Sequence, residues 1–353
     1  MGAAVPLPDP TEDRAFCSET LPKVSRTFAL CIRLLPAELE HPILVSYLLC
    51  RVADTIEDTV SLDSTSKESL LSHFSSCLER DGPSAAPLAD AFAATSGNDE
   101  ILAREADAVL REFHRLPTSQ QDAVRPWIQK MCEGMTEFEK PDRSIGTMDD
   151  LDRYCYYVAG TVGHLLTELF CESNKSMSSA CAERLRSLAT SFGLGLQLTN
   201  IIKDVGDDRR RGRSFIPRQL WQSAGTRSGE LANEPYRPEA QSVMRALIHK
   251  AKRHLRDALE YTVNLPRRMY RVRLFCLTSL YFAVRTIYLA ERDQRLLDPH
   301  HKVKISRRQV YRTVATTRLI APCNSLVKAY FKRLAGGDSW ADAREHHVGG
   351  VVR

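Results

Sequence analysis

The sequence predicts an all-α protein that forms one domain, with helices surrounding a central cavity. Apolar residues recur at three- and four-residue spacing almost throughout the chain, which is the period of a helix with one buried face. Alternation of apolar and polar residues, the pattern of a half-buried strand, is scarce. Breaks between the periodic segments are dense in turn-forming residues, and the chain shows neither a clear domain linker nor an internal repeat.

The expected helices follow one another with four longer connections between them. Helices over 22–34, 40–60 and 66–79 come before a loop region of small residues at 81–100. Helices over 100–115 and 120–138 come before the turn segment 140–147. The next two, over 148–172 and 178–208, come before the loop 223–239. Helices over 239–263 and 270–291, the connector 298–304 and a helix over 306–333 complete the domain, which spans 1–353 with flexible ends at 1–13 and 335–353.

Composition excludes several classes of protein. The 353 residues carry a net charge of +5 with interspersed signs, which suits an anionic substrate or membrane surface and is too weak to predict nucleic-acid binding. Ten cysteines without a CxxC pair favour a reducing compartment. The N-terminus lacks a secretory signal, and Arg285 interrupts the apolar stretch 274–290, so a buried helix is expected there. We therefore expect a cytoplasmic protein, monomeric and at most peripherally attached to a membrane.

A first acidic cluster lies in RVADTIEDT, on a helix that is otherwise apolar. Asp54, Glu57 and Asp58 stand at i, i+3 and i+4, so a helix places them on one face, which extends back to Arg51 and Tyr47. Carboxylates at this spacing repel each other by about 0.2–0.5 kcal/mol unless a cation lies between them. An exposed helix face would explain the cluster equally well, so this segment alone does not identify a metal site.

A second cluster lies in FGLGLQLTNIIKDVGDD. Gln197, Asn200, Asp204 and Asp208 stand at i, i+3, i+7 and i+11, again one polar stripe on an apolar helix. Two such helices facing each other would supply oxygen ligands of the kind that Mg²⁺ or Mn²⁺ binds together with phosphate oxygens and water. No His or Cys group has zinc spacing, and no EF-hand, GxxxxGK[ST] or GxGxxG motif is present.

Arginines accompany both clusters. Arg26, Arg51 and Arg213 offer forked donors that suit phosphate oxygens, whereas the run Arg209–Arg211 is also explained as a solvated positive face. Metal ions and arginines aimed at one anion are typical of sites that stabilise a phosphoryl or diphosphate leaving group.

The segment YCYYVAGTVG (154–163) lies between the clusters. Gly160 and Gly163 permit close approach of another helix or of a ligand chain. Tyr157 would suit a place near a developing carbocation or a transferable proton, although a hydrogen-bonded core tyrosine is the commoner case.

Together these segments resemble the squalene and phytoene synthase family, whose members join two prenyl diphosphates head to head. The resemblance covers roughly 14–334 and is most specific in SRTFAL, YLLCRVADTIED, YCYYVAGTVG and LQLTNIIKDVGDDRRRGRSFIP. It implies an isoprenoid-synthase fold in which two aspartate-rich helices hold Mg²⁺ across a pocket for two farnesyl or geranylgeranyl diphosphates. The chain departs from the family at Lys203, where arginine is common, and at Asp207, where glutamate is frequent.

The resemblance also assigns roles to individual residues. Tyr157 matches the tyrosine of the first half-reaction. The acidic residues would bind metal or diphosphate: Asp54, Glu57, Asp58, Asp204 and Asp208. The substrate site would be lined by Ser25, Arg26, Phe28, Tyr47, Arg51, Gln197, Asn200 and Arg213.

Subfamily features point in two directions. YCYYVAGTVG and DVGDDRRRGRSFIP resemble phytoene synthases, whereas DTIED and VRLFCLTSLYFAVRTI followed by HHKVKISRRQVY resemble squalene synthases. The second resemblance implies NADPH as cofactor, with Phe275 and Cys276 lining the pocket and its phosphates bound by Lys304, Ser306, Arg307 and Arg308. A basic helix start on the surface is the alternative for the last four.

The expected function is that of a squalene synthase in sterol or hopanoid biosynthesis. On this resemblance the chain would condense two farnesyl diphosphates through presqualene diphosphate in a Mg²⁺-dependent reaction and would reduce the product with NADPH. The alternatives are a phytoene or dehydrosqualene synthase without the NADPH step, a presqualene diphosphate synthase, and a prenyl-lipid-binding assembly subunit. The two self-repelling carboxylate clusters argue against a pure binding protein.

Overall fold

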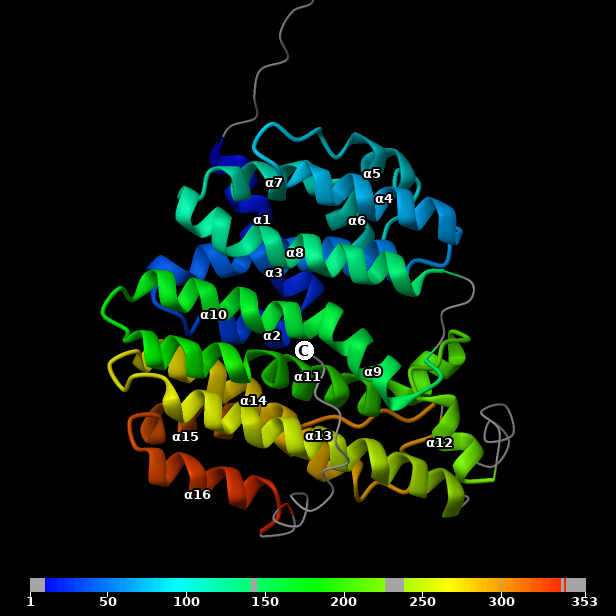
Figure 1. Cartoon of the computed structure of the whole chain (residues 1–353), viewed down its shortest axis with the longest axis vertical. Coiled ribbons are helices and arrows are strands. Elements are labelled where there is room, and N and C mark those ends of the chain that lie inside the picture. The colour runs from blue at the N-terminus through cyan, green and yellow to red at the C-terminus, as the bar shows by residue number, and fades with distance from the viewer. Residues whose placement is uncertain (1–9, 141–144, 226–237, 299, 338–339, 341–353) are drawn as a thin grey trace, which may run out of the picture. The chain divides into compact units, whose positions relative to one another are not determined.

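The structure, a computed structural model, describes residues 10–140, 145–225, 238–298, 300–337 and 340. These residues form helices and turns and contain no strand, which confirms the predicted all-α class (Figure 1). The chain divides into two compact units. Unit 1 is Met1–Arg143 with His164–Met177, and unit 2 is Ser144–Gly163 with Ser178–Arg353. That they act as one catalytic domain stays a prediction.

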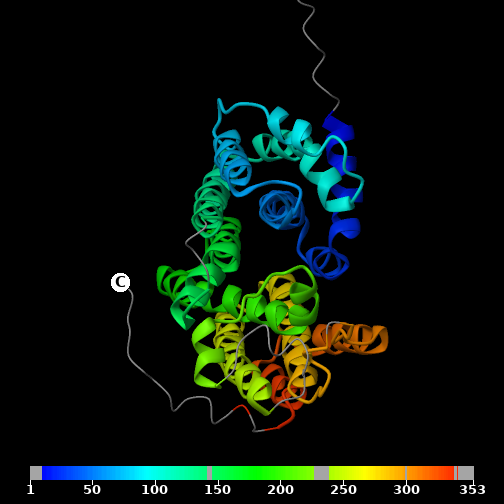
Figure 2. The ribbon, with the colours of Figure 1, turned by 90° about the vertical axis from the view of Figure 1, so that its right-hand side faces the viewer.

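Unit 1 is built around one long buried helix, α3. Its helices are α1 (Pro10–Val24), α2 (Arg26–Ile32), α3 (Ala37–Asp58), α4 (Ser64–Cys77), α5 (Ala86–Ala91), α6 (Asn98–Arg104), α7 (Ala106–His114), α8 (Thr118–Phe138) and most of α10 (Thr161–Ser173). Figure 2 shows α3 nearly end-on, with other helices of the unit around it. Leu48, Leu49 and Val52 are fully buried on this helix. A polar side chain on α3 therefore lies on an element held by the core of the unit.

Unit 2 is organised by the pairing of α11 and α13, which pack side by side. Its helices are α9 (Met148–Cys155), the π-helix η1 (Tyr156–Gly160), α11 (Ser179–Arg210), α12 (Arg218–Ser223), α13 (Pro238–Asn264), α14 (Tyr270–Ala290), α15 (Arg307–Ile320) and α16 (Asn324–Leu334). Within the described residues, α14 alone is long and apolar enough to cross a membrane, and 83% of its most apolar window is buried in the protein. A buried helix was expected there, and the structure confirms it.

Helix boundaries differ from the expected ones at several places. The helix expected over 22–34 is broken at Ser25, whose hydroxyl accepts a hydrogen bond from the Phe28 amide as the N-cap of α2. The helix expected over 306–333 is interrupted between α15 and α16, where Pro322 cannot continue the hydrogen-bond ladder. Two short helices were not expected: α5 lies in the expected loop region 81–100, and α12 lies between the helix expected over 178–208 and the loop 223–239.

The two expected flexible ends lie partly outside the described residues. In the N-terminal one, residues 10–13 already belong to α1, because buried Asp13 accepts hydrogen bonds from Arg111 and Arg115 on α7 and at its end. In the C-terminal one, Trp340 is buried with its ring edge-on to Phe331, the centroids 5.4 Å apart.

Arg273 on α14 is a fully buried arginine that joins the ends of neighbouring helices. Its guanidinium donates to the carbonyls of Thr262 and Leu265 at the end of α13, both at 2.8 Å, and to that of Ala321 after α15 at 2.9 Å. A fourth bond reaches Asn324 Oδ1 at the start of α16, at 2.6 Å. These acceptors would lose their partner together if the side chain were removed.

The variant Arg273→Leu is expected to lower the free energy of unfolding by about 3–5 kcal/mol, because several buried acceptors lose their donors. Urea titration followed by circular dichroism measures this loss. Arg245→Leu, at an exposed position on α13, is the matched control and should change stability by less than about 0.5 kcal/mol. Equal effects of the two substitutions would contradict the structural role of Arg273.

Candidate active site

The first acidic stripe lies at the C-terminal end of α3 in unit 1. Asp54 is half-buried, Asp58 is exposed and Glu57 is buried, so the three predicted carboxylates differ in their access to solvent. Lys67 Nζ donates to the backbone carbonyl of Glu57 at 2.6 Å. Glu57 thus lies at the buried edge of the stripe, and Asp54 and Asp58 are its accessible members.

Arg51 connects the stripe to a residue that sequence reasoning missed. Its Nε donates to Asp99 Oδ1 on α6 at 2.8 Å, and its Nη1 lies 3.7 Å from Asp54 Oδ2. Desolvation raises the pKa of Asp54 to about 7, and the negative charges of Asp58 and Asp99 act in the same direction, while Arg51 opposes them. The carboxylates of Asp54, Asp58 and Asp99 thus lie around one arginine, Arg51, which suits a site for a cation.

Predicted residues of the SRTFAL segment contact α3 at Tyr47, one to two turns before the acidic stripe. Phe28 stacks on Tyr47 with ring centroids 5.2 Å apart, and Tyr47 also hydrogen-bonds to Ser25. Burial raises the pKa of Tyr47 to about 12, so its hydroxyl stays protonated. Arg26 is exposed at the first position of α2. Within unit 1, Ser25, Phe28, Tyr47 and Arg51 thus lie close together.

The second acidic stripe lies on α11 in unit 2. Gln197, Asp204 and Asp208 are half-buried and Asn200 is exposed, on a helix whose intervening residues Ile201, Ile202 and Val205 are buried. This confirms the predicted polar stripe on an apolar helix. The helix ends just beyond it, because Gly212 adopts a positive φ of 71° and turns the chain. The Arg213 amide then donates to the carbonyl of Asp208 at 2.9 Å, which places this arginine beside the stripe.

Two lysines neutralise the α11 stripe in the structure. Lys203 pairs with Asp204. Lys302, from the connector before α15, lies 2.8 Å from Asp204 Oδ1 and 2.7 Å from Asp207 Oδ2. Lys302 and Arg210 hold the pKa of Asp207 down at about 2. The α11 carboxylates are thus paired with positive groups from their own helix and from the connector before α15.

The tyrosine segment adopts a π-helix between α9 and α10. This widened turn comprises Tyr156–Gly160, and such turns are frequent at functional sites. Gly163 packs directly against α11, since a Cβ there would lie 2.2 Å from the Ala189 carbonyl oxygen. Gly193 on α11 packs equally closely, because its Cβ would lie 2.1 Å from the Ala159 carbonyl oxygen. The prediction that Gly163 permits close helix approach is confirmed, and Gly193 is its unpredicted counterpart.

The predicted cofactor residues surround the N-terminus of α15. Ser306 is its N-cap and forms a capping box, in which its hydroxyl accepts from the Gln309 amide while the Gln309 side chain accepts from the Ser306 amide. Lys304, Arg307 and Arg308 are exposed. Phe275 and Cys276 are at most 1% exposed, in the core of unit 2. Their predicted contact with a cofactor stays a prediction.

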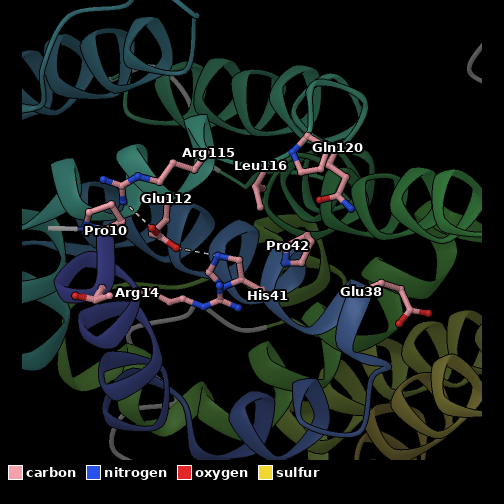
Figure 3. A pocket seen from close by; sticks show the side chains of 11 residues that line it. Pro10, Arg14, Glu38, His41, Pro42, Glu112, Arg115, Leu116 and Gln120 are labelled. Carbon is pink, nitrogen blue, oxygen red and sulfur yellow. Dashed lines mark hydrogen bonds and ion pairs between the residues drawn. The ribbon is translucent and has the colours of Figure 1, made fainter.

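A separate cavity of about 520 Å³ opens in unit 1 beside the starts of α1, α3 and α8 (Figure 3). Glu112 lies between His41 Nε2 at 2.9 Å and Arg115 Nη1 at 2.7 Å. None of the residues singled out from the sequence lines this cavity. The central cavity expected from the sequence stays a prediction.

The described residues contain no group of three or more His, Cys, Asp or Glu side chains arranged to hold a metal ion by themselves. Mg²⁺ usually takes few carboxylates from a protein and completes its octahedron with water and substrate phosphates, so the oxygen donors of the two stripes fit this ion by their chemistry.

Comparison with known proteins gives a consistent result. The squalene/phytoene synthase family matches residues 21–309. The squalene synthase of Cyberlindnera jadinii is 30% identical over 331 residues, spanning 90% of this chain and 70% of that protein. The squalene synthase ERG9 of Saccharomyces cerevisiae is 29% identical over 325 residues with the same coverage.

Solved structures agree with the sequence relatives. A structure of TcSQS with the ligand E5700 has a TM-score of 0.77 at 30% identity and covers 92% of each chain. A dehydrosqualene synthase in complex with a ligand shares the fold, with a TM-score of 0.59 at 21% identity, covering 92% of this chain and 100% of that one. The match over both acidic stripes and the tyrosine segment identifies the chain as a prenyltransferase of the squalene/phytoene synthase family.

Proposed function

We propose that the chain is a squalene synthase that condenses two farnesyl diphosphates through presqualene diphosphate and reduces the product with NADPH. The observation that carries the proposal is the pair of carboxylate stripes, one on α3 around Arg51 and one on α11 whose aspartates pair with Lys203 and Lys302. The names of the relatives, squalene synthases matched over about nine-tenths of the chain, support the choice of product.

The stripe residues Asp54, Glu57, Asp58, Asp204 and Asp208 would hold Mg²⁺ together with the diphosphates of the substrates. The bound ions would neutralise the diphosphate and so make it a better leaving group. Arg26, Arg51 and Arg213 donate hydrogen bonds to the same phosphate oxygens. Arg51 would be oriented for this by Asp99, because the 2.8 Å hydrogen bond at Nε fixes the plane of the guanidinium and leaves further Nη donor hydrogens for an anion, although Nη1 lies 3.7 Å from Asp54 Oδ2.

The remaining predicted residues position the carbon chains and move protons. Ser25, Phe28, Tyr47, Gln197 and Asn200 would line the substrate site. Tyr157 carries a phenol on the π-helix and would exchange the proton that the first half-reaction releases. The aromatic and apolar side chains that line the substrate site would keep water away from the carbocations of the reaction, because water would otherwise react with them.

The basic start of α15 provides the proposed NADPH contacts. Lys304, Arg307 and Arg308 are exposed and bind phosphate groups, and the Ser306 hydroxyl can still donate while it caps the helix. Phe275 and Cys276 would form the apolar floor of this pocket. The cofactor would supply the hydride of the second half-reaction.

A product assay tests the function. Purified protein with farnesyl diphosphate and Mg²⁺ is expected to release squalene only when NADPH is added, as read by gas chromatography–mass spectrometry. The variant Lys304→Glu with Arg308→Glu should consume farnesyl diphosphate normally yet need about 100-fold more NADPH, since two favourable charge contacts become repulsive.

The matched control for this variant is Arg245→Glu with Arg253→Glu, which makes the same charge change at exposed positions on α13. It should leave the NADPH requirement unchanged. Dehydrosqualene, phytoene or presqualene diphosphate formed regardless of NADPH would contradict the cofactor assignment and keep the condensation. No product from farnesyl or geranylgeranyl diphosphate would contradict the enzyme assignment as a whole.

A further inference from the structure

The last described part of unit 2 has a strongly one-sided charge. Over the whole chain, 49 basic residues are nearly balanced by 44 acidic ones. Between Asp298 and Asp338, however, the sequence contains no aspartate or glutamate. The same stretch contains nine basic residues: Lys302, Lys304, Arg307, Arg308, Arg312, Arg318, Lys328, Lys332 and Arg333. All nine are exposed, and although Lys302 pairs with Asp204 and Asp207 of α11, the stretch as a whole carries an excess of positive charge.

The outer face of α15 combines these charges with large apolar side chains. Thr313 and Thr317 form the buried side of the helix, which packs on α14. At 3.6 residues per turn, the opposite side, about a third of the circumference, carries Arg308, Tyr311, Arg312, Ala315, Arg318 and Leu319. Tyr311 is 72% exposed and Leu319 is 81% exposed. An isolated apolar residue on a surface needs no explanation, but here two lie on one stripe among three arginines.

The neighbouring helix α16 continues the same composition. Leu326 is 51% exposed, Lys332 and Arg333 are exposed on the side away from buried Val327 and Phe331, and Lys328 is exposed on its flank. Helices α15 and α16 contact each other, and in Figure 2 α15 (orange) lies at one edge of unit 2. The positive and apolar surface therefore extends over two adjacent helices, well beyond the four residues assigned to NADPH at the start of α15.

We propose that the outer faces of α15 and α16 bind the surface of a membrane that contains anionic lipids. Basic residues attract the anionic headgroups, and aliphatic side chains between them enter the boundary between headgroups and acyl chains. Tyrosine suits the same depth, because its ring is apolar and its hydroxyl remains hydrated. A nucleic acid would use the positive charge, but it gains stacking from aromatic side chains and little from Leu319 and Leu326.

This inference goes beyond the proposed reaction, and its test needs no turnover. The full chain is mixed with vesicles of phosphatidylcholine alone or of phosphatidylcholine with phosphatidylglycerol, and the bound fraction is measured by sedimentation. Binding is expected only to the vesicles with phosphatidylglycerol. It should weaken strongly between about 0.1 M and about 1 M NaCl, because the screening length falls from about 10 Å to about 3 Å.

Two kinds of variant separate the contributions of charge and insertion. Arg312→Glu with Arg318→Glu should lower the partition coefficient by at least about 30-fold, since each lost basic residue accounts for about a fivefold change. Leu319→Ser should lower it by about tenfold with the charge unchanged. Both sites are exposed, so the melting temperatures should match that of the parent.

The matched control is Arg80→Glu with Arg245→Glu, which makes the same charge change at exposed positions away from α15 and α16 and should retain binding. Equal loss in this control would show attraction by net charge alone and overturn the proposed surface. Vesicle binding that is independent of phosphatidylglycerol, or unaffected by Leu319→Ser, would also overturn it. Displacement of the vesicles by polyuridylate at equal charge concentration would favour nucleic acid instead.

Discussion

Replacing Asp54 by asparagine is expected to reduce turnover by about 10²–10³-fold, as loss of one group that stabilises a developing charge typically does. The same variant should make the protein without Mg²⁺ and substrate more stable at neutral pH. The pKa of Asp54, about 7, lies above its ordinary value of 3.8. The folded protein therefore binds this proton more tightly than the unfolded chain, and ionisation of Asp54 destabilises the fold.

The gain in stability of Asp54→Asn is expected to depend on pH. The destabilisation by Asp54 develops as pH rises from about 4 and is complete above about 7. Because Asp54 is partly exposed, we expect Asp54→Asn to be more stable by only about 1–3 kcal/mol at pH 8, and by nearly nothing at pH 4. Urea unfolding at the two pH values measures the difference.

A control and a second stripe complete this test. Asp81→Asn removes one exposed carboxylate from the same unit and should leave turnover and stability unchanged.

Asp204→Asn should also reduce turnover by about 10²–10³-fold, since it removes the carboxylate that pairs with Lys203 and Lys302. Lost turnover together with a lower stability at pH 8 would assign Asp54 a structural role and contradict our interpretation.

The parts of this site that could be predicted from the sequence are those within one helix. Asp54 and Arg51 share a face of α3 because helical spacing alone places them there, and the same holds for Asn200 and Asp204 on α11. The all-α class followed from the same periodicity. These features depend on residues that are close in sequence, so local rules are sufficient to find them.

The parts that could not be predicted depend on contacts between distant residues. Arg51 pairs with Asp99, 48 positions away, and Lys302 with Asp207, 95 positions away. Neither pairing leaves a periodic signal. The helix α1 was missed for a related reason, because Pro22 weakens its local pattern and the buried pairs of Asp13 with Arg111 and Arg115 hold it in place. The break at Ser25 is different. A serine N-cap is a recognisable local signal, so this helix boundary could have been predicted from the sequence.

Gly193→Ala is expected to destabilise unit 2 by about 3 kcal/mol or more, because the added methyl group overlaps backbone atoms that cannot turn away. Its Cβ would lie 2.1 Å from the carbonyl oxygen of Ala159 and 2.8 Å from the Gly160 amide nitrogen. To fit, α11 and the π-helix would have to separate. That shift would change the relation of the α11 stripe to Tyr157, so turnover should fall further than the loss of folded protein explains.

Gly195→Ala provides a control with the same substitution on the same helix. Its nearest neighbour would be the Leu255 side chain, Cδ2 at 3.0 Å, which can move, with backbone atoms of His254 and Leu255 at 3.2 Å. We therefore expect a loss below about 1 kcal/mol. Melting curves and turnover per folded molecule separate the two variants. Similar stability for both would mean that α11 and η1 are less closely packed than the structure shows. Normal turnover in folded Gly193→Ala would mean that the spacing of α11 from the tyrosine segment does not control the reaction.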